Sequence, residues 1–104
     1  MNSYQSISQE EAKKIMDEQT GYLILDVREE DEFLQGHIDD AVCLSYLQIE
    51  EKAEQLFPDK EQMILVYCRS GRRSKIAAES LAKLGYMHIL EFGGILSWPY
   101  EIIK

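Results

Sequence analysis

Residues 63–74 read MILVYCRSGRRS, and this stretch decides the fold of the chain. Its first five residues form the strongest strand pattern in the sequence, typical of a strand buried on both faces. A short loop with one glycine follows, and a helical pattern begins at Arg73. Strand, tight loop and helix in this order predict a parallel α/β sheet, in which ligands bind beyond the carboxyl ends of the strands. Cys68 lies at such an end.

Helical and strand patterns alternate along the rest of the chain. Ser8 and Glu11 have the spacing of a helix-capping box, so we expect a helix to begin there and to stop near Gly21. We expect Leu56 and Ile76 to face the core, because each lies on the hydrophobic side of a helical pattern. The other predicted elements are strands over 22–27, 41–44, 63–67 and 86–92, helices over 29–35, 49–56, 73–84 and 95–100, and a turn at Gly93-Gly94.

This alternation predicts the fold class. Buried strands that are each followed by a helix indicate an α/β fold, with an open, mainly parallel sheet of about five strands and helices on both faces. The chain has 104 residues, which is enough for one hydrophobic core, so we expect a single domain over residues 1–104. A hydrophobic content of 45% excludes a disordered chain.

Composition also limits the partners of the protein. No hydrophobic run approaches the ~20 residues that cross a membrane, and the N-terminal residues lack the hydrophobic core of a signal peptide. The two cysteines and two histidines form no metal-binding or disulfide pattern. We therefore expect a cytoplasmic protein with reduced thiols, no metal, no cofactor and no membrane partner. The net charge of −8 argues against nucleic acid as a partner.

Charge is distributed unevenly along the chain. Residues 1–61 hold 16 acidic and 5 basic residues, whereas residues 62–104 hold 3 acidic and 6 basic residues. Four of the 11 basic residues follow closely after Cys68, and no acidic residue intervenes before Glu79. Such a local cluster can hold a small anion on a protein that repels polyanions. The cluster consists of Arg69, Arg72, Arg73 and Lys75.

Cys68 is the candidate nucleophile. A cysteine between a buried strand and the start of a helix faces free backbone N–H groups and the positive end of the helix dipole, and both stabilise a thiolate. Gly71 can adopt a left-handed conformation, so that the loop amides turn inward to bind an anion. A lone cysteine at a strand end is more often buried and inert. The glycine and the basic residues of this loop favour instead a nucleophile that acts on an anionic substrate.

Four sequence blocks resemble the signatures of the rhodanese family of sulfurtransferases. All four occur in the family's order, and the resemblance to a single-domain rhodanese extends from about Ile7 to Trp98. The chain departs from the family pattern at Asp40, where Gly is usual, and at Cys43 and Ser45, where Asn and Pro are common. The blocks are Ile24-Leu25-Asp26-Val27-Arg28 with Glu32-Phe33, Gly36-His37-Ile38-Asp39-Asp40-Ala41, Cys68-Arg69-Ser70-Gly71-Arg72-Arg73, and Gly93-Gly94-Ile95 with Trp98.

The resemblance implies an enzyme similar to thiosulfate sulfurtransferase. Cys68 would accept a sulfane sulfur from a small anionic donor such as thiosulfate, release sulfite, and pass the sulfur from its persulfide to a thiol, cyanide or protein acceptor. The backbone amides of residues 69–73 would hold the terminal sulfur, and the arginines would attract the anion. The anion-binding loop then comprises Arg69, Ser70, Gly71, Arg72 and Arg73.

Two polar residues and a second cysteine lie near the same edge of the predicted sheet. We expect Asp26 and Arg28 to have a supporting role, with Arg28 paired to Glu32 and Asp26 holding its loop by hydrogen bonds. Cys43 lies between hydrophobic neighbours, which favours a buried, inert thiol over a resolving thiol. We expect His37 to tie loops together rather than to act as a base.

Two alternatives belong to other functional classes. A Cys-dependent phosphatase also holds its cysteine in an amide-lined loop, but its arginine would have to occupy position 74, which is Ser74. Arg73 leaves the loop one residue shorter, and the shorter loop favours a single sulfur atom over a phosphoryl group. A persulfide carrier or a regulatory protein-binding module would keep the loop without turnover, and the sequence leaves that alternative open.

Overall fold

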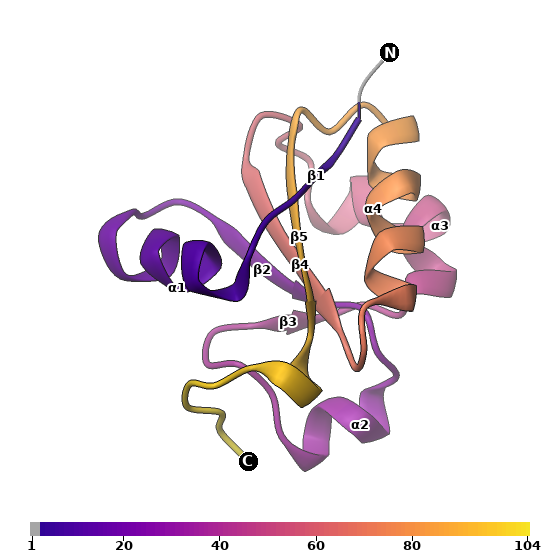
Figure 1. Ribbon diagram of the computed structural model, residues 1–104. Coiled ribbons are helices and arrows are strands. Elements are labelled where there is room, and N and C mark those ends of the chain that lie inside the picture. The colour runs from indigo at the N-terminus through magenta and orange to yellow at the C-terminus, as the bar shows by residue number, and fades with distance from the viewer. Residues whose placement is uncertain (1–2) are drawn as a thin grey trace.

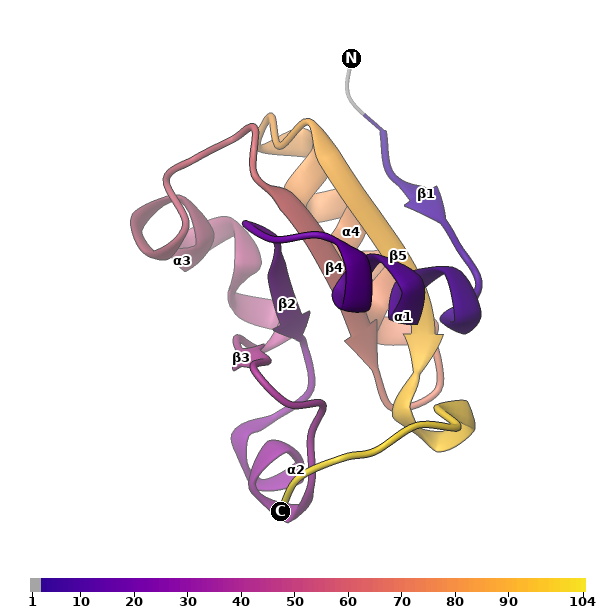
Figure 2. The ribbon, with the colours of Figure 1, turned by 90° about the vertical axis from the view of Figure 1, so that its left-hand side faces the viewer.

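A five-stranded parallel sheet forms the centre of the computed structural model, which describes residues 3–104 (Figures 1 and 2). The strand order is β1-β5-β4-β2-β3, and all four pairings are parallel. β4 is therefore the central strand, and the predicted α/β class and parallel sheet are confirmed. The strands are β1 (Gln5–Ser6), β2 (Leu23–Asp26), β3 (Val42–Cys43), β4 (Met63–Cys68) and β5 (His88–Gly94).

Helices cover both faces of the sheet. They are α1 (Gln9–Glu18), α2 (Glu30–Gln35), α3 (Ile49–Leu56) and α4 (Arg72–Lys83). α1 lies on one face, α3 and α4 lie on the other, and α2 lies beyond the carboxyl ends of the strands (Figure 1). One hydrophobic cluster, which includes Val66 and Leu81, packs on the α3 and α4 side, and a second, with Leu65 and Trp98, packs on the α1 side. No helix within residues 3–104 is long and hydrophobic enough to span a membrane.

Local sequence explains the central elements. The five consecutive residues from Ile64 to Cys68 have no exposed area, as expected for a strand covered on both faces. The capping box at the start of α1 is also confirmed. The Ser8 hydroxyl accepts a hydrogen bond from the Glu11 N–H at 3.0 Å, and the Glu11 carboxylate accepts one from the Ser8 N–H at 3.3 Å.

Two predicted core positions are wrong. Leu56 is 53% exposed, because α3 ends there and the following residue, Phe57, takes the inward position. Ile76 is 38% exposed, because α4 presents its small residues to the sheet. Ala77 and Ala78 are fully buried at this contact, and short side chains allow the helix to lie close to the strands.

The C-terminal prediction is wrong in two respects. The predicted turn at Gly93-Gly94 belongs to β5, which continues until Gly94 pairs with Cys68 of β4. The predicted helix over 95–100 is a single 3₁₀ turn, Ile95–Ser97. Trp98 has extended backbone angles, because the residue before a proline, here Pro99, is sterically disfavoured in a helical conformation.

Asp40 occupies a backbone conformation that usually requires glycine. Its φ is +68°, and among residues 3–104 no other residue except glycine has a positive φ. Asp tolerates this region better than most residues, because its short polar side chain can form local hydrogen bonds. The departure from the family's usual Gly therefore keeps the turn that leads to β3.

Gly94 lets the loop after β4 approach β5. A Cβ atom at this position would lie 2.1 Å from the Arg69 carbonyl oxygen and 2.5 Å from the Ser70 nitrogen. Both atoms belong to the backbone, so neither can rotate away. The Arg69 carbonyl also accepts a hydrogen bond from the Leu96 N–H at 3.1 Å, which fixes the loop against the end of the sheet.

We predict that Gly94→Ala lowers the free energy of unfolding by about 3 kcal/mol, because the new methyl group overlaps the loop backbone. Urea unfolding measures this loss. Gly21→Ala is the matched control: its Cβ meets nothing within 4 Å, so it reports only the cost of a positive φ, about 1–2 kcal/mol. An equal loss of unfolding free energy in the two variants would show that the close approach at Gly94 does not contribute to stability.

Candidate active site

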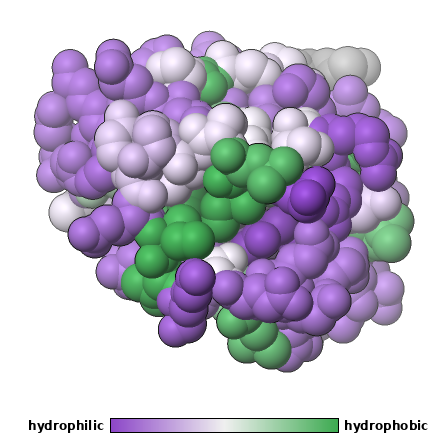
Figure 3. All heavy atoms as spheres, turned by 60° about the horizontal axis from the view of Figure 1, so that its bottom comes forward, coloured by the Kyte–Doolittle hydropathy of each residue, from purple (hydrophilic) through white to green (hydrophobic). Residues whose placement is uncertain are grey.

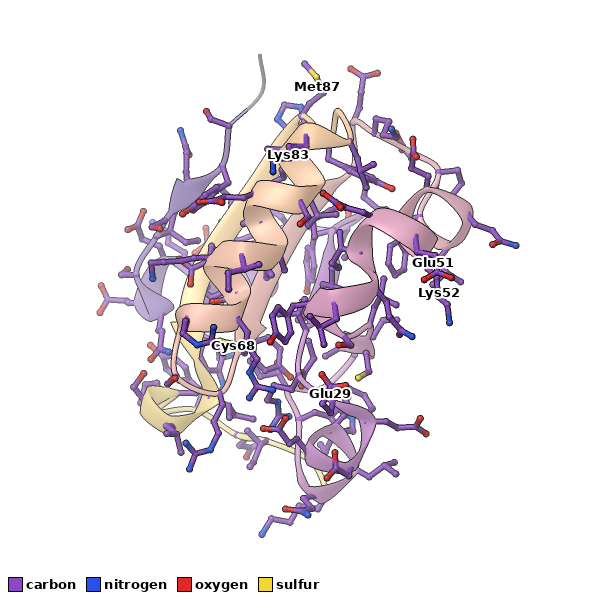
Figure 4. The ribbon with its side chains drawn as sticks, turned by 90° about the vertical axis from the view of Figure 1, so that its right-hand side faces the viewer. Glu29, Glu51, Lys52, Cys68, Lys83 and Met87 are labelled. Carbon is purple, nitrogen blue, oxygen red and sulfur yellow. The ribbon has the colours of Figure 1, made fainter. Side chains whose placement is uncertain are left out.

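Cys68 lies where β4 turns into the loop before α4 (Figure 4). The residue is fully buried, and its Sγ accepts a hydrogen bond from the Gly71 N–H at 3.0 Å. Gly71 is the N-cap of α4 with a φ of +113°, a left-handed conformation that turns its amide back toward the sulfur. The first amides of a helix lack partners within the helix, so this end of α4 favours negative charge near Cys68.

The inner side of Cys68, toward Glu91 of β5, holds two residues to which the sequence assigned no role in the site. The Cys68 thiol lies 3.4 Å from Ser74 Oγ, and the Ser74 hydroxyl donates to Oε2 of Glu91 at 2.7 Å. Ser74 falls on the inward face of α4 with Ala77 and Leu81, a spacing that indicates burial. Glu91 was recognisable as the one charged residue inside the otherwise hydrophobic pattern of β5, a position where a carboxylate needs partners.

Glu91 is only 1% exposed, and all of its partners are polar. It accepts hydrogen bonds from the Ser6 hydroxyl at 2.9 Å and the Gly93 N–H at 2.8 Å, and Lys75 Nζ lies 3.5 Å away. Burial raises the pKa of Glu91, but the hydrogen bonds from Ser74, Ser6 and Gly93 outweigh it, so the pKa is lowered overall. Glu91 is therefore ionised at neutral pH.

The arginines of the loop differ in their surroundings. Arg73 forms a two-pronged ion pair with Glu32 of α2, with N···O distances of 2.7 Å and 2.9 Å. The hydrogen bond from Arg73 lowers the pKa of Glu32 to about 2. Arg69 and Arg72 are exposed, and within residues 3–104 neither has a carboxylate within ion-pair distance. Arg73 therefore ties α4 to α2, whereas Arg69 and Arg72 face solvent.

Asp26 and Arg28 form a buried ion pair at the end of β2. Arg28 donates to both carboxylate oxygens of Asp26, at 2.7 Å to 3.1 Å, and to the Gly36 carbonyl at 2.7 Å. The expected pairing of Arg28 with Glu32 is wrong, because Glu32 pairs with Arg73 instead. The expectation that Asp26 holds its own loop is confirmed, since it also accepts a hydrogen bond from the Arg28 N–H at 3.0 Å.

Cys43 lies too far across the sheet to bond with Cys68. It pairs with Asp26 of β2, which in turn pairs with Tyr67 of β4. Two strand spacings separate the cysteine Cα atoms by about 10 Å, beyond the ~7 Å that a disulfide spans. The Cys43 thiol donates to the Arg28 carbonyl at 3.5 Å, and burial raises its pKa to about 11. Both findings fit the expected inert thiol.

His37 connects three segments of chain. Its ring stacks on Phe33 with centroids 3.7 Å apart, and its Nδ1 lies 3.0 Å from the Phe33 carbonyl. Its backbone pairs with Ile103 in both directions. These contacts confirm that His37 ties loops together.

No metal-binding cluster of three or more His, Cys, Asp or Glu side chains occurs within residues 3–104. A cavity of about 650 Å³ lies between α1 and the C-terminal segment, lined by residues that include Lys13, Tyr22 and Trp98. It contains no residue of the loop that follows β4. The groups that the structure places beside the Cys68 thiol are the Gly71 amide and the Ser74 hydroxyl.

Comparisons with known proteins agree with this geometry. The rhodanese-like domain family matches residues 8–99. The thiosulfate sulfurtransferase GlpE of Coxiella burnetii is 33% identical over 91% of this chain and 87% of its own length. The thiosulfate sulfurtransferase PspE of Escherichia coli is 34% identical over 68% of each protein. Other relatives are longer, and the chain spans 65% of one from Schizosaccharomyces pombe and 52% of one from Bacillus subtilis.

Solved structures give the same assignment. A rhodanese-related protein from Thermoplasma volcanium superposes with a TM-score of 0.82 and 30% identity, over 96% of this chain and 98% of its own. A rhodanese from E. coli, solved with anions, gives 0.74 and 30%, over 80% of this chain and 98% of its own. With a family match across the fold and relatives named as sulfurtransferases over most of the chain, this protein belongs to the rhodanese-like sulfurtransferase family.

Proposed function

We propose that this protein is a sulfurtransferase that carries a sulfane sulfur on Cys68. The hydrogen bond from the Gly71 N–H to Sγ carries this proposal, because it aims the amide-rich start of α4 at the sulfur. The Cys68 thiolate attacks the outer sulfur of a donor such as thiosulfate, and the S–S bond of the donor breaks as sulfite leaves with its electron pair. The negative charge of the persulfide then resides on the outer sulfur.

The second half of the reaction returns the enzyme to its starting state. A nucleophilic acceptor (a thiol, cyanide or a protein) attacks the outer sulfur, and the Cys68 thiolate leaves. The face at the carboxyl ends of the strands carries a band of hydrophobic residues among hydrophilic ones (Figure 3). Leu34 of α2 and Leu96 are 65% and 63% exposed, which supports a protein among the acceptors.

Loop length supports sulfur rather than phosphate as the transferred group. α4 begins at Arg72, and Ser74 faces Cys68 where a phosphatase would carry its arginine. Arg73 turns away to Glu32. The reaction also requires a compartment that keeps the Cys68 thiol reduced, and we propose the cytoplasm. A carrier that holds the persulfide without turnover would share this site. It would differ from the enzyme only in the rate of sulfur transfer to an acceptor.

We assign Arg69 and Arg72 to anion binding. We also propose that residues 1–104 form a single domain. Both arginines are exposed, Arg69 in the loop after Cys68 and Arg72 at the start of α4, so their charges attract a dianion on a protein with a net charge of −8. Glu32 already neutralises the charge of Arg73, so we propose that Arg73 maintains the geometry of the site rather than binding the anion.

Cys68→Ser is predicted to abolish sulfur transfer, whereas Cys43→Ser keeps most of it. Intact mass spectrometry after incubation with thiosulfate should find one added sulfur atom on wild type and Cys43→Ser, and cyanide should remove it. A Cys43→Ser protein that is folded by circular dichroism yet as inactive as Cys68→Ser would reverse the assignment. Loading without steady-state turnover would identify a carrier.

Arg72→Gln is predicted to raise the KM for thiosulfate about fivefold, which corresponds to ~1 kcal/mol of lost binding. The kcat should change little, because the charge attracts the ground state and the transition state alike. Lys83→Gln is the matched control, since it removes the same charge from the other end of α4 (Figure 4). The same KM in both variants would remove Arg72 from the anion site.

The ion pair between Arg73 and Glu32 should give stability that depends on pH. Because the folded-state pKa of Glu32 is lowered from 4.5 to about 2, the stabilisation is present above pH 4.5 and is lost as the pH falls toward 2. Glu32→Gln should therefore lower the free energy of unfolding by about 1 kcal/mol at neutral pH and by nothing near pH 2. A difference that does not change with pH would contradict the pairing.

A further inference from the structure

On the inner side of Cys68, the Ser74 oxygen has no proton to donate to Sγ. A serine hydroxyl carries one proton, and three oxygens compete for that of Ser74. Oε2 of Glu91 lies at 2.7 Å, the Gly71 carbonyl at 3.0 Å and the Gly93 carbonyl at 3.4 Å. The carboxylate is both the nearest and the only charged acceptor, so the proton points to Glu91. Ser74 then offers a lone pair to Sγ, 3.4 Å away, and accepts from the thiol.

The charged groups differ between the inner side of Cys68 and its outer side, which faces the loop and its arginines. On the inner side, Glu91 of β5 is ionised, and β1 adds only the uncharged hydroxyl of Ser6. Lys75 of α4 lies 3.5 Å from Oε1, but its side chain is half exposed, so water weakens its effect. The outer side holds the Gly71 N–H, the exposed Arg69 and Arg72, and Arg73, which is neutralised by Glu32 of α2.

We propose that Glu91 is a positioning residue for Cys68: through Ser74 it places a hydrogen-bond acceptor against Sγ and disfavours negative charge on that atom. Glu91 opposes negative charge less on the outer sulfur of a persulfide. That sulfur lies farther from the Glu91 carboxylate than Sγ does, and nearer to the N–H groups of the loop. The arrangement therefore favours a persulfide, whose charge is on the outer sulfur, over a bare thiolate. This inference deepens the proposed function and rests on Cys68 being the reacting thiol.

The pH dependence of alkylation by iodoacetamide tests the proposal without any sulfur donor. All variants carry Cys43→Ser, so that only Cys68 reacts, and rates are measured from about pH 5 to about pH 9. Glu91→Gln removes the inner charge, and Ser74→Ala removes the acceptor for the thiol proton. We expect both variants to react faster than the parent on the acidic side, by about tenfold for Glu91→Gln and about threefold for Ser74→Ala.

Three further variants separate this role from a structural one. Glu79→Gln removes a carboxylate from the exposed face of α4 and should leave the alkylation profile unchanged. Ser74→Thr keeps the hydroxyl and should restore the profile of the parent. In the Ser74→Ala background, Glu91→Gln should accelerate alkylation less than it does alone, because the link through the hydroxyl is gone.

The direction of the change in Ser74→Ala decides the proposal even if Glu91→Gln fails to fold. Slower alkylation in acid would show that Ser74 donates its proton to the thiolate, and the proposal would be wrong. Identical profiles for Glu91→Gln and Glu79→Gln would also overturn it. If the profiles change as expected but thiosulfate adds no sulfur to Cys68, the role of Glu91 stands and the proposed sulfurtransferase function fails.

Discussion

The site depends on the close approach of the loop after β4 to the end of β5. Gly94 has no side chain, so the peptide between Arg69 and Ser70 can lie where a Cβ atom would otherwise be. This approach turns the loop sharply enough for the Gly71 amide to reach Sγ at 3.0 Å. α4 begins at the next residue, so its positive end faces the buried thiol. Without this contact the amides would not converge on Cys68.

Cys68 is consequently held between two unlike surroundings. The outer side offers amide donors and exposed arginines, which favour negative charge. The inner side offers Ser74 and the buried carboxylate of Glu91, which oppose it. A persulfide suits this arrangement because its charge lies one atom farther from Glu91. The ion pair between Arg73 and Glu32 ties α4 to α2 beside the loop.

The parts of the site that are contiguous in the chain were predictable from sequence. Strand, loop and helix follow one another around Cys68, so composition alone indicated an amide-lined thiol. The hydrogen-bond partners of Glu91 were not predictable from sequence. Ser74 lies 17 residues away, and Ser6 lies 85 residues away on a strand too short to predict. The Arg28 pairing failed because α2 begins only at Glu30, so helical spacing does not bring Arg28 to Glu32.

The amides at the start of α4 should hold the outer sulfur once Cys68 is loaded. The ¹H–¹⁵N NMR spectrum of uniformly labelled protein tests it directly, with and without an equivalent of thiosulfate. The Gly71 amide and its neighbours in residues 69–73 should change chemical shift on loading and return to their starting shifts when cyanide removes the sulfur. Unchanged amides in a protein that mass spectrometry finds loaded would contradict this prediction, as would changes confined to the surroundings of Cys43.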